Sequence, residues 1–390
     1  MLLSALDRRL SAKVVGRLVL TLPSGRSHVI GTSGDIAEVS VLSFQAVWKC
    51  MRRGTIGFAD AYLVGEVSTP DLGAVFRFFI DNRPILSAEG RGAFQVRAAD
   101  KTVHRNRANT REGSKRNISD HYDLGNDFYA LWLDAGMSYS SGIYLAPDTT
   151  LDASQTAKYD AILDALELNG GESVLEIGCG WGGFVEAAAA RGANVKAITI
   201  SERQRAYTAD RIVAAGGRWP GRASVRFCDY RDTTGTYDRV ASIEMVEAVG
   251  AEHWPKYFQT LHDRLVPGGI AAIQAISIRE ASFDNYAAKA DFIQRFIFPG
   301  GMLPTPSHLR RHAQDAGLVC DDVQTFGSSY ARTLDEWRRR FHEQWPQIEA
   351  LGFDDRFRKL WDYYLAYCEA GFQRGVVDVG IYKYRRPVVA

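Results

Sequence analysis

The sequence predicts a doubly wound α/β domain of seven strands, preceded by a small α+β domain. From about residue 153 onward, strand-like apolar runs alternate with helical patterns. This order indicates right-handed crossovers and a parallel sheet covered by helices on both faces. Before about residue 100, short β-rich runs are mixed with helical pattern. A chain of 390 residues is long enough for one large domain and a smaller companion.

The N-terminal domain is predicted to span residues 1–103. Its clearest elements are strands near 17–22 and 38–42 and a helix over 71–81. Residues 104–120 form a predicted basic linker, because the stretch 104–117 carries five Arg or Lys residues and almost no apolar ones. A solvated loop is one interpretation of this charge, and contact with anionic phospholipid headgroups is the other.

The larger domain is predicted to span residues 121–390. Five strands are expected at 173–177, 195–200, 224–228, 240–245 and 270–278. A helix is expected before the first strand, at 154–168, and further helices are expected between the strands, at 183–191, 202–215 and 254–265. A turn is expected at 267–269. After residue 306 the pattern predicts helices at 307–316, 334–345 and 354–372, and strands at 318–326 and 376–384. The last two strands should extend the sheet, and residues 285–306 should form a cap.

Composition excludes several classes of protein. Apolar residues make up 46% of the chain and charged residues 24%, as in ordinary globular proteins. The net charge of +1 gives no global field for nucleic acid. Five scattered cysteines without a CxxC pair favour neither a disulfide framework nor a zinc site. Without a signal-like start or 18 consecutive apolar residues, a cytoplasmic protein with no membrane span is expected.

A glycine-rich loop follows the first strand of the larger domain. In ESVLEIGCGWGG (172–183), Gly178 and Gly180 allow a sharp turn and close ligand approach at a helix start. This spacing alone fits a dinucleotide, S-adenosylmethionine or a turn without a ligand. Glu176 favours S-adenosylmethionine, because an acid there would repel a pyrophosphate. The next strands end in side chains suited to ribose and adenine, namely Thr199, Ser201, Asp229 and Tyr230.

Eight stretches, the glycine-rich loop among them, occur in an order typical of one family. They are HYDLGNDFYALWLD (121–134), MSYSSGIY (137–144), EIGCGWGG (176–183), ITISERQ (198–204), DYRD (229–232), IEMVEAVG (243–250), DFIQRFIFPGGMLP (291–304) and SYARTLDEW (329–337). Together they resemble the cyclopropane-fatty-acyl-phospholipid synthases and their relatives, including the mycolic acid methyltransferases. Residues 57–72 look like the N-terminal domain of the members that act on phospholipids.

The resemblance implies a class I, Rossmann-like methyltransferase domain with a helical cap, and it assigns a cofactor site. Its members methylate the cis double bond of an acyl chain with S-adenosylmethionine. Tyr139 and Ser140 would hold the methionine end with the two loop glycines, and Thr199 and Gln204 would serve the ribose. Asp229 and Tyr230 would lie beside the adenine, and Ile243 would line the pocket.

The resemblance also implies how the reaction ends. Attack on the alkene leaves a carbocation, and a bound bicarbonate is the family's base. Glu247 and Tyr330 match two of its side-chain ligands, and Ile276 matches a backbone donor. Ser141 replaces the usual cysteine and Gln274 the usual histidine, while Ala248 follows Glu247. Glutamine donates a hydrogen bond but cannot titrate. Methyl transfer is therefore a firmer expectation than ring closure, and the product is a cyclopropane or a methyl- or methylene-branched chain.

Other interpretations stay open. Glu247 could cap a helix, Tyr330 could be an ordinary packed aromatic, and His121, a further catalytic candidate, could be a helix cap. His308 and His312 stand four apart but lack an evident third metal ligand. The rival functions are methylation of a soluble small molecule, lipid binding by a decayed enzyme, and nicotinamide-dependent oxidoreduction. For the favoured function we expect peripheral docking on the inner face of an anionic membrane, through the N-terminal domain and the basic segment, and a homodimer is compatible with it.

Overall fold

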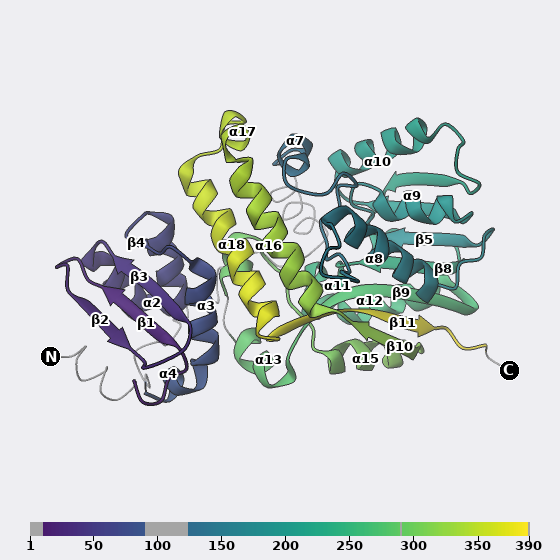
Figure 1. Ribbon diagram of the computed structural model, residues 1–390. Coiled ribbons are helices and arrows are strands. Elements are labelled where there is room, and N and C mark those ends of the chain that lie inside the picture. The colour runs from purple at the N-terminus through teal and green to yellow at the C-terminus, as the bar shows by residue number, and fades with distance from the viewer. Residues whose placement is uncertain (1–10, 90–123, 289–290, 389–390) are drawn as a thin grey trace.

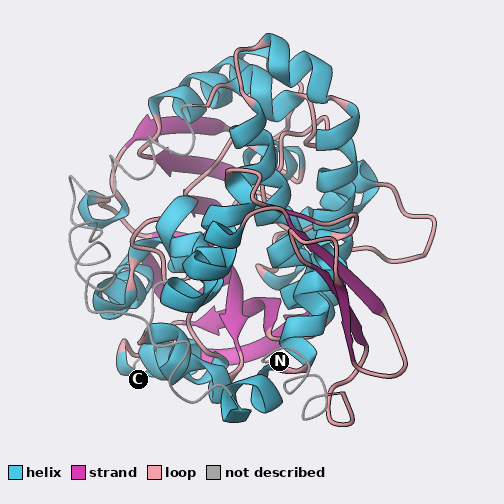
Figure 2. Cartoon of the chain, turned by 90° about the vertical axis from the view of Figure 1, so that its left-hand side faces the viewer, coloured by secondary structure: helices cyan, strands magenta, loops and turns pink. Residues whose placement is uncertain are grey.

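The computed structural model describes residues 11–89, 124–288 and 291–388, and these form two sheets joined by helices. In Figure 1 the smaller sheet lies on the left and the larger one on the right, with two long helices, α16 (Gly327–Glu343) and α18 (Asp355–Gln373), between them. Figure 2 views the molecule from the side of the smaller sheet and shows helices packed around the strands of both. The basic segment and His121 lie outside the described residues.

The larger sheet has seven strands in the order β10-β11-β9-β8-β5-β6-β7. Their bounds are β5 Ser173–Ile177, β6 Asn194–Thr199, β7 Ala223–Phe227, β8 Tyr237–Ile243, β9 Leu265–Ile278, β10 Val319–Thr325 and β11 Val377–Arg385. Strands β5 to β9 pair in parallel, whereas β11 is antiparallel to both β9 and β10. The doubly wound fold and the extension of the sheet by the last two strands are thus confirmed.

Helices cover both faces of this sheet and enclose two apolar cores. On one face lie α8 (Leu151–Ala165) and α9 (Gly183–Ala190), which contribute Ile162 and Phe184 to the first core. On the other lie α12 (Trp254–Arg264) and α15 (Pro306–Asp315), which contribute Phe258 and Leu309 to the second. The remaining helices of this part are α7 Asn126–Ala130, α10 Glu202–Ala215, α11 Val246–Val249, α13 Glu280–Ala287, α14 Phe292–Phe296 and α17 Trp345–Ala350, with 3₁₀ turns at Tyr230–Asp232 and Ala251–His253. Because β5 pairs in parallel with β6 and β8, the carboxyl ends of these strands meet at one edge of the sheet, where ligands bind in such folds.

The smaller sheet has four strands in the order β2-β1-β3-β4 and packs against three helices. The strands are β1 Arg17–Thr21, β2 Ser27–Ile30, β3 Ile36–Val41 and β4 Val67–Ser68, and the helices are α2 Phe44–Leu63, α3 Leu72–Asp81 and α4 Arg83–Glu89. This unit docks on α18, where the rings of Phe76 and Tyr363 lie 4.8 Å apart and the Tyr62 hydroxyl donates to Asp362 over 2.8 Å. The N-terminal unit is thus fixed to the helices that also flank the site.

Two of the predicted elements show the largest differences from the structure. The expected turn at residues 267–269 is instead part of β9, which begins at Leu265 and bulges where Tyr237 and Arg239 oppose Leu265 and Ile270. Backbone bonds between this bulge and Arg386 hold it in the sheet. Helix α16 begins at Gly327, seven residues before the predicted start, since its first turns carry the buried Tyr330.

Candidate active site

The glycine-rich loop has the backbone geometry that the sequence predicted. Gly178 and Gly180 have φ of 81° and 51°, in the left-handed region that favours glycine. A Cβ on Gly178 would lie 2.5 Å from the sulfur of Met245, so only glycine fits against that side chain. The amides of Gly178 and Cys179 both donate to the carbonyl of Ile198 on β6, which fixes the loop to the sheet. The loop therefore forms a rigid floor at the carboxyl edge of the strands.

A cavity opens above this loop, and ten of the eleven predicted cofactor residues line it. They are Tyr139, Ser140, Glu176, Gly178, Gly180, Thr199, Gln204, Asp229, Tyr230 and Ile243. Ser201 has a different position: its hydroxyl accepts from the amide of Gln204 and caps α10. The structure thus brings together residues that are up to about a hundred positions apart in the sequence.

The predicted ribose and adenine residues are held by local bonds. Thr199 donates its hydroxyl to the side chain of Gln204 over 3.1 Å and accepts from the amide of Ser201. Asp229 receives two side-chain bonds from Arg231, at 2.6 and 2.9 Å. The Tyr230 hydroxyl is buried without a hydrogen-bond partner among the described residues. A buried hydroxyl without a protein partner is suited to hydrogen-bond with a bound ligand.

A buried lysine, which the sequence analysis did not single out, lies beside the methionine end of the cavity. Lys158 on α8 is fully buried and donates to the hydroxyl of Ser140 over 2.9 Å. Burial lowers its pKa to about 8, against the opposing pull of Asp134, Glu244 and Glu176. Burial raises the pKa of Glu176 to about 8, and Lys158 acts against that rise. One Glu176 oxygen has no hydrogen-bond partner in the described part of the chain, so this acid is available to a cationic ligand.

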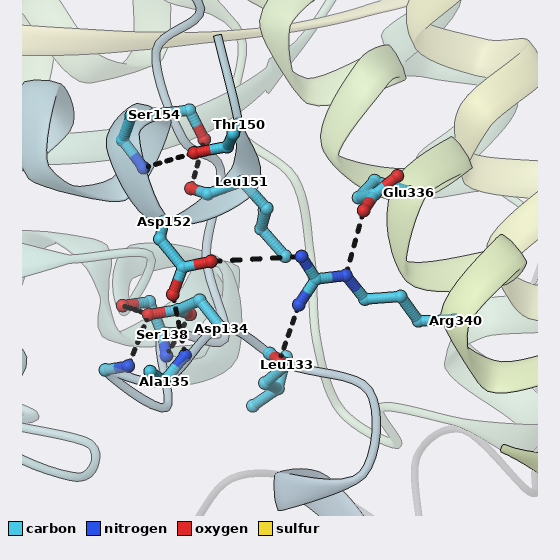
Figure 3. Close-up of polar contacts among 12 residues, drawn as sticks. Leu133, Asp134, Ala135, Ser138, Thr150, Leu151, Asp152, Ser154, Glu336 and Arg340 are labelled. Carbon is cyan, nitrogen blue, oxygen red and sulfur yellow. Dashed lines mark hydrogen bonds and ion pairs between the residues drawn. The ribbon is translucent and has the colours of Figure 1, made fainter.

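The segment that carries Tyr139 to Ser141 is braced from α16. Figure 3 shows Arg340 reaching from α16 to the carbonyl of Leu133, at 3.1 Å, and towards the carboxylate of Asp152, at 3.9 Å. Asp152 accepts from the amide of Ala135, and Asp134 accepts from the amide of Ser138 over 2.7 Å. These contacts fix the loop immediately before the cavity-lining pair.

The residues that the resemblance assigned to bicarbonate converge on a carboxylate of the protein itself. Glu244 follows β8 and lines the cavity. Its Oε1 accepts from the amide of Ser141 over 2.9 Å and from the side-chain N–H of Gln274 over 2.7 Å. Its Oε2 accepts from the hydroxyl of Tyr330 over 2.7 Å. Sequence reasoning missed Glu244, although it lies only three positions before Glu247.

Glu247 lies three residues after Glu244 and outside the cavity lining. One of its oxygens accepts from the backbone amide of Ile276, and the other is buried without a partner among the described residues. Burial, and then the nearby charge of Glu244, raise the pKa of Glu247 to about 8. The predicted catalytic residues therefore divide into two groups: Ser141, Gln274 and Tyr330 bond to Glu244, and Ile276 bonds to Glu247. In both groups the donors expected to hold bicarbonate are hydrogen-bonded to a glutamate of the protein instead.

The raised pKa of Glu247 predicts a pH-dependent stability difference. In the unfolded chain this carboxyl ionises near the ordinary glutamate pKa of 4.5, whereas the folded protein keeps its proton up to about pH 8. Its contribution to stability is thus complete below that lower value and is lost as the pH rises through the folded one. Glu247→Gln keeps an acceptor for Ile276 and cannot titrate.

We therefore expect the free energy of unfolding of Glu247→Gln, relative to the parent protein, to increase between about pH 5 and about pH 8 in urea titrations. Glu252→Gln, at an exposed position on the neighbouring turn, is the control and should show a constant difference. A constant difference for Glu247→Gln as well would contradict the assigned proton.

His308 lies in the first turn of α15, where its Nδ1 accepts from the amide of Thr305 over 3.3 Å and its ring packs on Phe283 and Trp254. Within residues 11–89, 124–288 and 291–388, no three His, Cys, Asp or Glu side chains are grouped as metal ligands. Among these same residues, no helix combines the length and apolarity needed to cross a bilayer.

The order of the seven strands, with a glycine loop after β5 and acidic side chains after the next strands, defines a class I S-adenosylmethionine-dependent methyltransferase fold. Residues 109–381 match the family described as mycolic acid cyclopropane synthetase. The chain belongs to this family, and it is a methyltransferase.

Known relatives narrow the chemistry to lipid-modifying methyltransferases. Tuberculostearic acid methyltransferase UfaA1 of Mycobacterium tuberculosis is 39% identical over 337 residues, which are 84% of this chain and 78% of the relative. Cyclopropane-fatty-acyl-phospholipid synthase of Escherichia coli is 32% identical, over 65% of this chain and 63% of the relative. The structure of mycolic acid cyclopropane synthase CmaA1 complexed with SAH and CTAB matches with a TM-score of 0.65 and 28% identity, covering 70% of this chain and 98% of that one.

Proposed function

We propose that the protein transfers a methyl group from S-adenosylmethionine to the cis double bond of an unsaturated acyl chain on a membrane phospholipid. The reaction would pass through a carbocation and give a cyclopropane or a methyl- or methylene-branched chain. The names of the relatives support both outcomes, because they include a tuberculostearic acid methyltransferase and a cyclopropane-fatty-acyl-phospholipid synthase.

The residues around the glycine loop fit S-adenosylmethionine. Glu176 has a buried oxygen without a partner among the described residues, which suits the cationic methionine end, and Gly178 leaves room that a Cβ would fill. Tyr139 and Ser140 would hold that same end. Thr199 and Gln204 would hold the ribose, and Asp229 and Tyr230 the adenine, with Ile243 beside them. When bound, this molecule supplies a methyl group on a positively charged sulfur, an electrophile strong enough for an alkene.

The observation that carries the proposal is an apolar wall within the cavity lining. Besides the residues given to the cofactor, the cavity is lined by the apolar Met245, Ala248, Val249, Phe298 and Pro299. The acidic Glu244 lines the same cavity. A wall of this kind suits a hydrocarbon chain and excludes water from a carbocation, whereas an amine or alcohol substrate would need polar partners.

The test is to incubate the protein with methyl-labelled S-adenosylmethionine and vesicles of phospholipid with a cis double bond, then to measure the acyl-chain mass. We expect a gain of one CH₂ unit. Vesicles of the saturated phospholipid are the matched control and should take up no label. Equal labelling of the saturated lipid, or labelling only of a soluble molecule without lipid, would contradict the proposal.

We further propose that the N-terminal unit docks on the inner face of an anionic membrane. An apolar face at the start of α2 supports this, formed by Leu42, Phe44, Trp48 and Met51, which are 57–65% exposed. Arg52 is exposed beside it, and a break at Gly54 separates this first half of α2 from the rest of the helix. Apolar side chains next to a basic one are typical of helices that lie in a membrane interface.

Replacing Phe44 and Trp48 together by serine should weaken sedimentation with anionic vesicles roughly tenfold or more, because both aromatic side chains lose their burial in the bilayer. Val213→Ser, which changes an equally exposed apolar residue on α10, is the control and should bind as before. Unchanged binding of the double variant would contradict this surface. Loss of binding only when the five basic residues of 104–117 are neutralised would assign the contact to that segment instead.

A further inference from the structure

The donors expected to hold a free bicarbonate are already used. Ser141 gives its amide to Glu244, and Tyr330 gives its only O–H to the same carboxylate. Gln274 has two N–H groups, of which one bonds to Glu244 and the other points to the carbonyl of Ser141 at 3.4 Å. Among the residues that the structure describes, these three donors would be open to a separate bicarbonate only if Glu244 moved away.

We infer that Glu244 is a built-in base that replaces a bound bicarbonate in this enzyme, so that its carboxylate accepts the proton released after methyl transfer. The inference rests on the proposed function and deepens it. A carboxylate and a bicarbonate both present two oxygens in one plane to hydrogen-bond donors. The Glu244 carboxylate is therefore chemically equivalent to a bound bicarbonate, but it is covalently attached to the protein and lines the cavity.

The bonds around Glu244 favour its ionised form. All three partners donate to it, as a carboxylate requires and a protonated acid would not. Burial raises the pKa of Glu244, while these three bonds and the charge of Lys158 act against that rise. The charge of Glu244 is in turn one cause of the raised pKa of Glu247, as expected for two neighbouring buried carboxyls.

The backbone at Glu244 is strained in a way that serves this position. Its φ is 50°, in a region that side chains other than glycine rarely adopt. Residues held in this region cluster at active sites, where the surroundings compensate for the strain. Here the amide of Glu244 bonds to the carbonyl of Gln274 on β9, and the next residue, Met245, packs on Gly178. The strained turn thus carries a carboxylate that lines the cavity and accepts from three donors.

The reaction balances with Glu244 as the base. The alkene π pair forms a bond to the methyl carbon while the carbon–sulfur bond breaks, and the sulfur keeps that bond's electron pair. The other alkene carbon becomes cationic, and Glu244 accepts a proton from the transferred methyl group. The released C–H pair closes a cyclopropane with the cationic carbon. If a hydride first moves from the methylated carbon to the cationic one, the same pair forms a methylene double bond.

The first test needs no variant. The parent protein is assayed for label transfer to unsaturated phospholipid vesicles in carbonate-free buffer under argon, with and without added bicarbonate. We expect equal rates. A rate that falls on removal of bicarbonate and returns on its addition would overturn the inference while leaving the proposed function intact. No transfer to lipid under either condition would instead reject the proposed function.

Variants at the same position supply the second test. Glu244→Gln should lower kcat by roughly a hundredfold or more, because the base is lost while S-adenosylmethionine affinity, measured by calorimetry, is kept. Glu244→Gly relieves the backbone and frees the three donors, so added bicarbonate or formate should restore part of its activity. Glu252→Gln is the matched surface control and should retain full activity. Parent-like kcat in Glu244→Gln, or no rescue of a folded, cofactor-binding Glu244→Gly, would overturn the inference.

Discussion

Replacing Lys158 by methionine is expected to destabilise the protein by about 3 to 5 kcal/mol. Lys158 is fully buried, donates to Ser140 and lies close enough to Asp134, Glu176 and Glu244 to influence all of them. Methionine keeps most of the volume but removes the cation, so these buried acids lose the positive charge among them. Removing one member of a buried group of opposite charges lowers the stability of the fold, because the remaining charges stay buried without compensation.

Urea unfolding at neutral pH measures this effect. Lys256→Met, on the exposed face of α12, is the matched control and should change stability by less than about 0.5 kcal/mol. The Lys158 variant should also lose methyl transfer, because Ser140 and the charge balance around Glu244 change together. Equal stability of the two variants would show that Lys158 does not hold the acids of the site.

Gly178→Ala is expected to weaken S-adenosylmethionine binding roughly ten- to a hundredfold. The added Cβ would lie 2.5 Å from the Met245 sulfur, and both residues line the cavity. The alanine must also adopt a φ of 81°, which L residues disfavour. Met245 can make room only by moving within the cavity, where it would displace the ligand or reshape the wall.

Calorimetric titration of S-adenosylmethionine measures this affinity. Gly171→Ala separates backbone strain from the clash, because Gly171 also has a positive φ, of 91°, but has no atom within 4 Å of an added Cβ and lies outside the cavity lining. It should lose some stability and keep its affinity. Equal affinity losses in both variants would mean that strain, and not the contact with Met245, controls the loop.

Local signals in the sequence were sufficient for much of the fold. Helix α10 has its predicted bounds, Glu202–Ala215, because Ser201 caps its start and Gly216 adopts the left-handed conformation at its end. Strand β5 also matches its predicted bounds, since the short run SVLEI leads directly into the glycine loop. The short strands β2 and β4 could not be predicted, because their four and two residues carry no periodic signal of their own.

The site was predictable where it follows strand ends and hidden where it depends on tertiary contacts. Gly178, Gly180, Asp229 and Tyr230 follow β5 and β7, so strand order places them together, whereas Tyr139 and Ser140 were assigned only through the family resemblance. Lys158 gave no signal, because a lysine on an amphipathic helix normally faces solvent. Glu244 was missed for another reason. Its role depends on a positive φ and on donors from Ser141, Gln274 and Tyr330, which come from three distant segments.

The most direct test of the central claim uses S-adenosylmethionine with a trideuterated methyl group and phospholipid with one cis double bond. We expect the acyl chain to gain one CD₂ unit, because the methyl carbon is transferred to the alkene and one deuteron then leaves it for Glu244. A chain that keeps all three deuterons and loses hydrogen from its own carbons would contradict the assigned proton transfer. A chain with no deuterium would contradict methylation of the lipid itself.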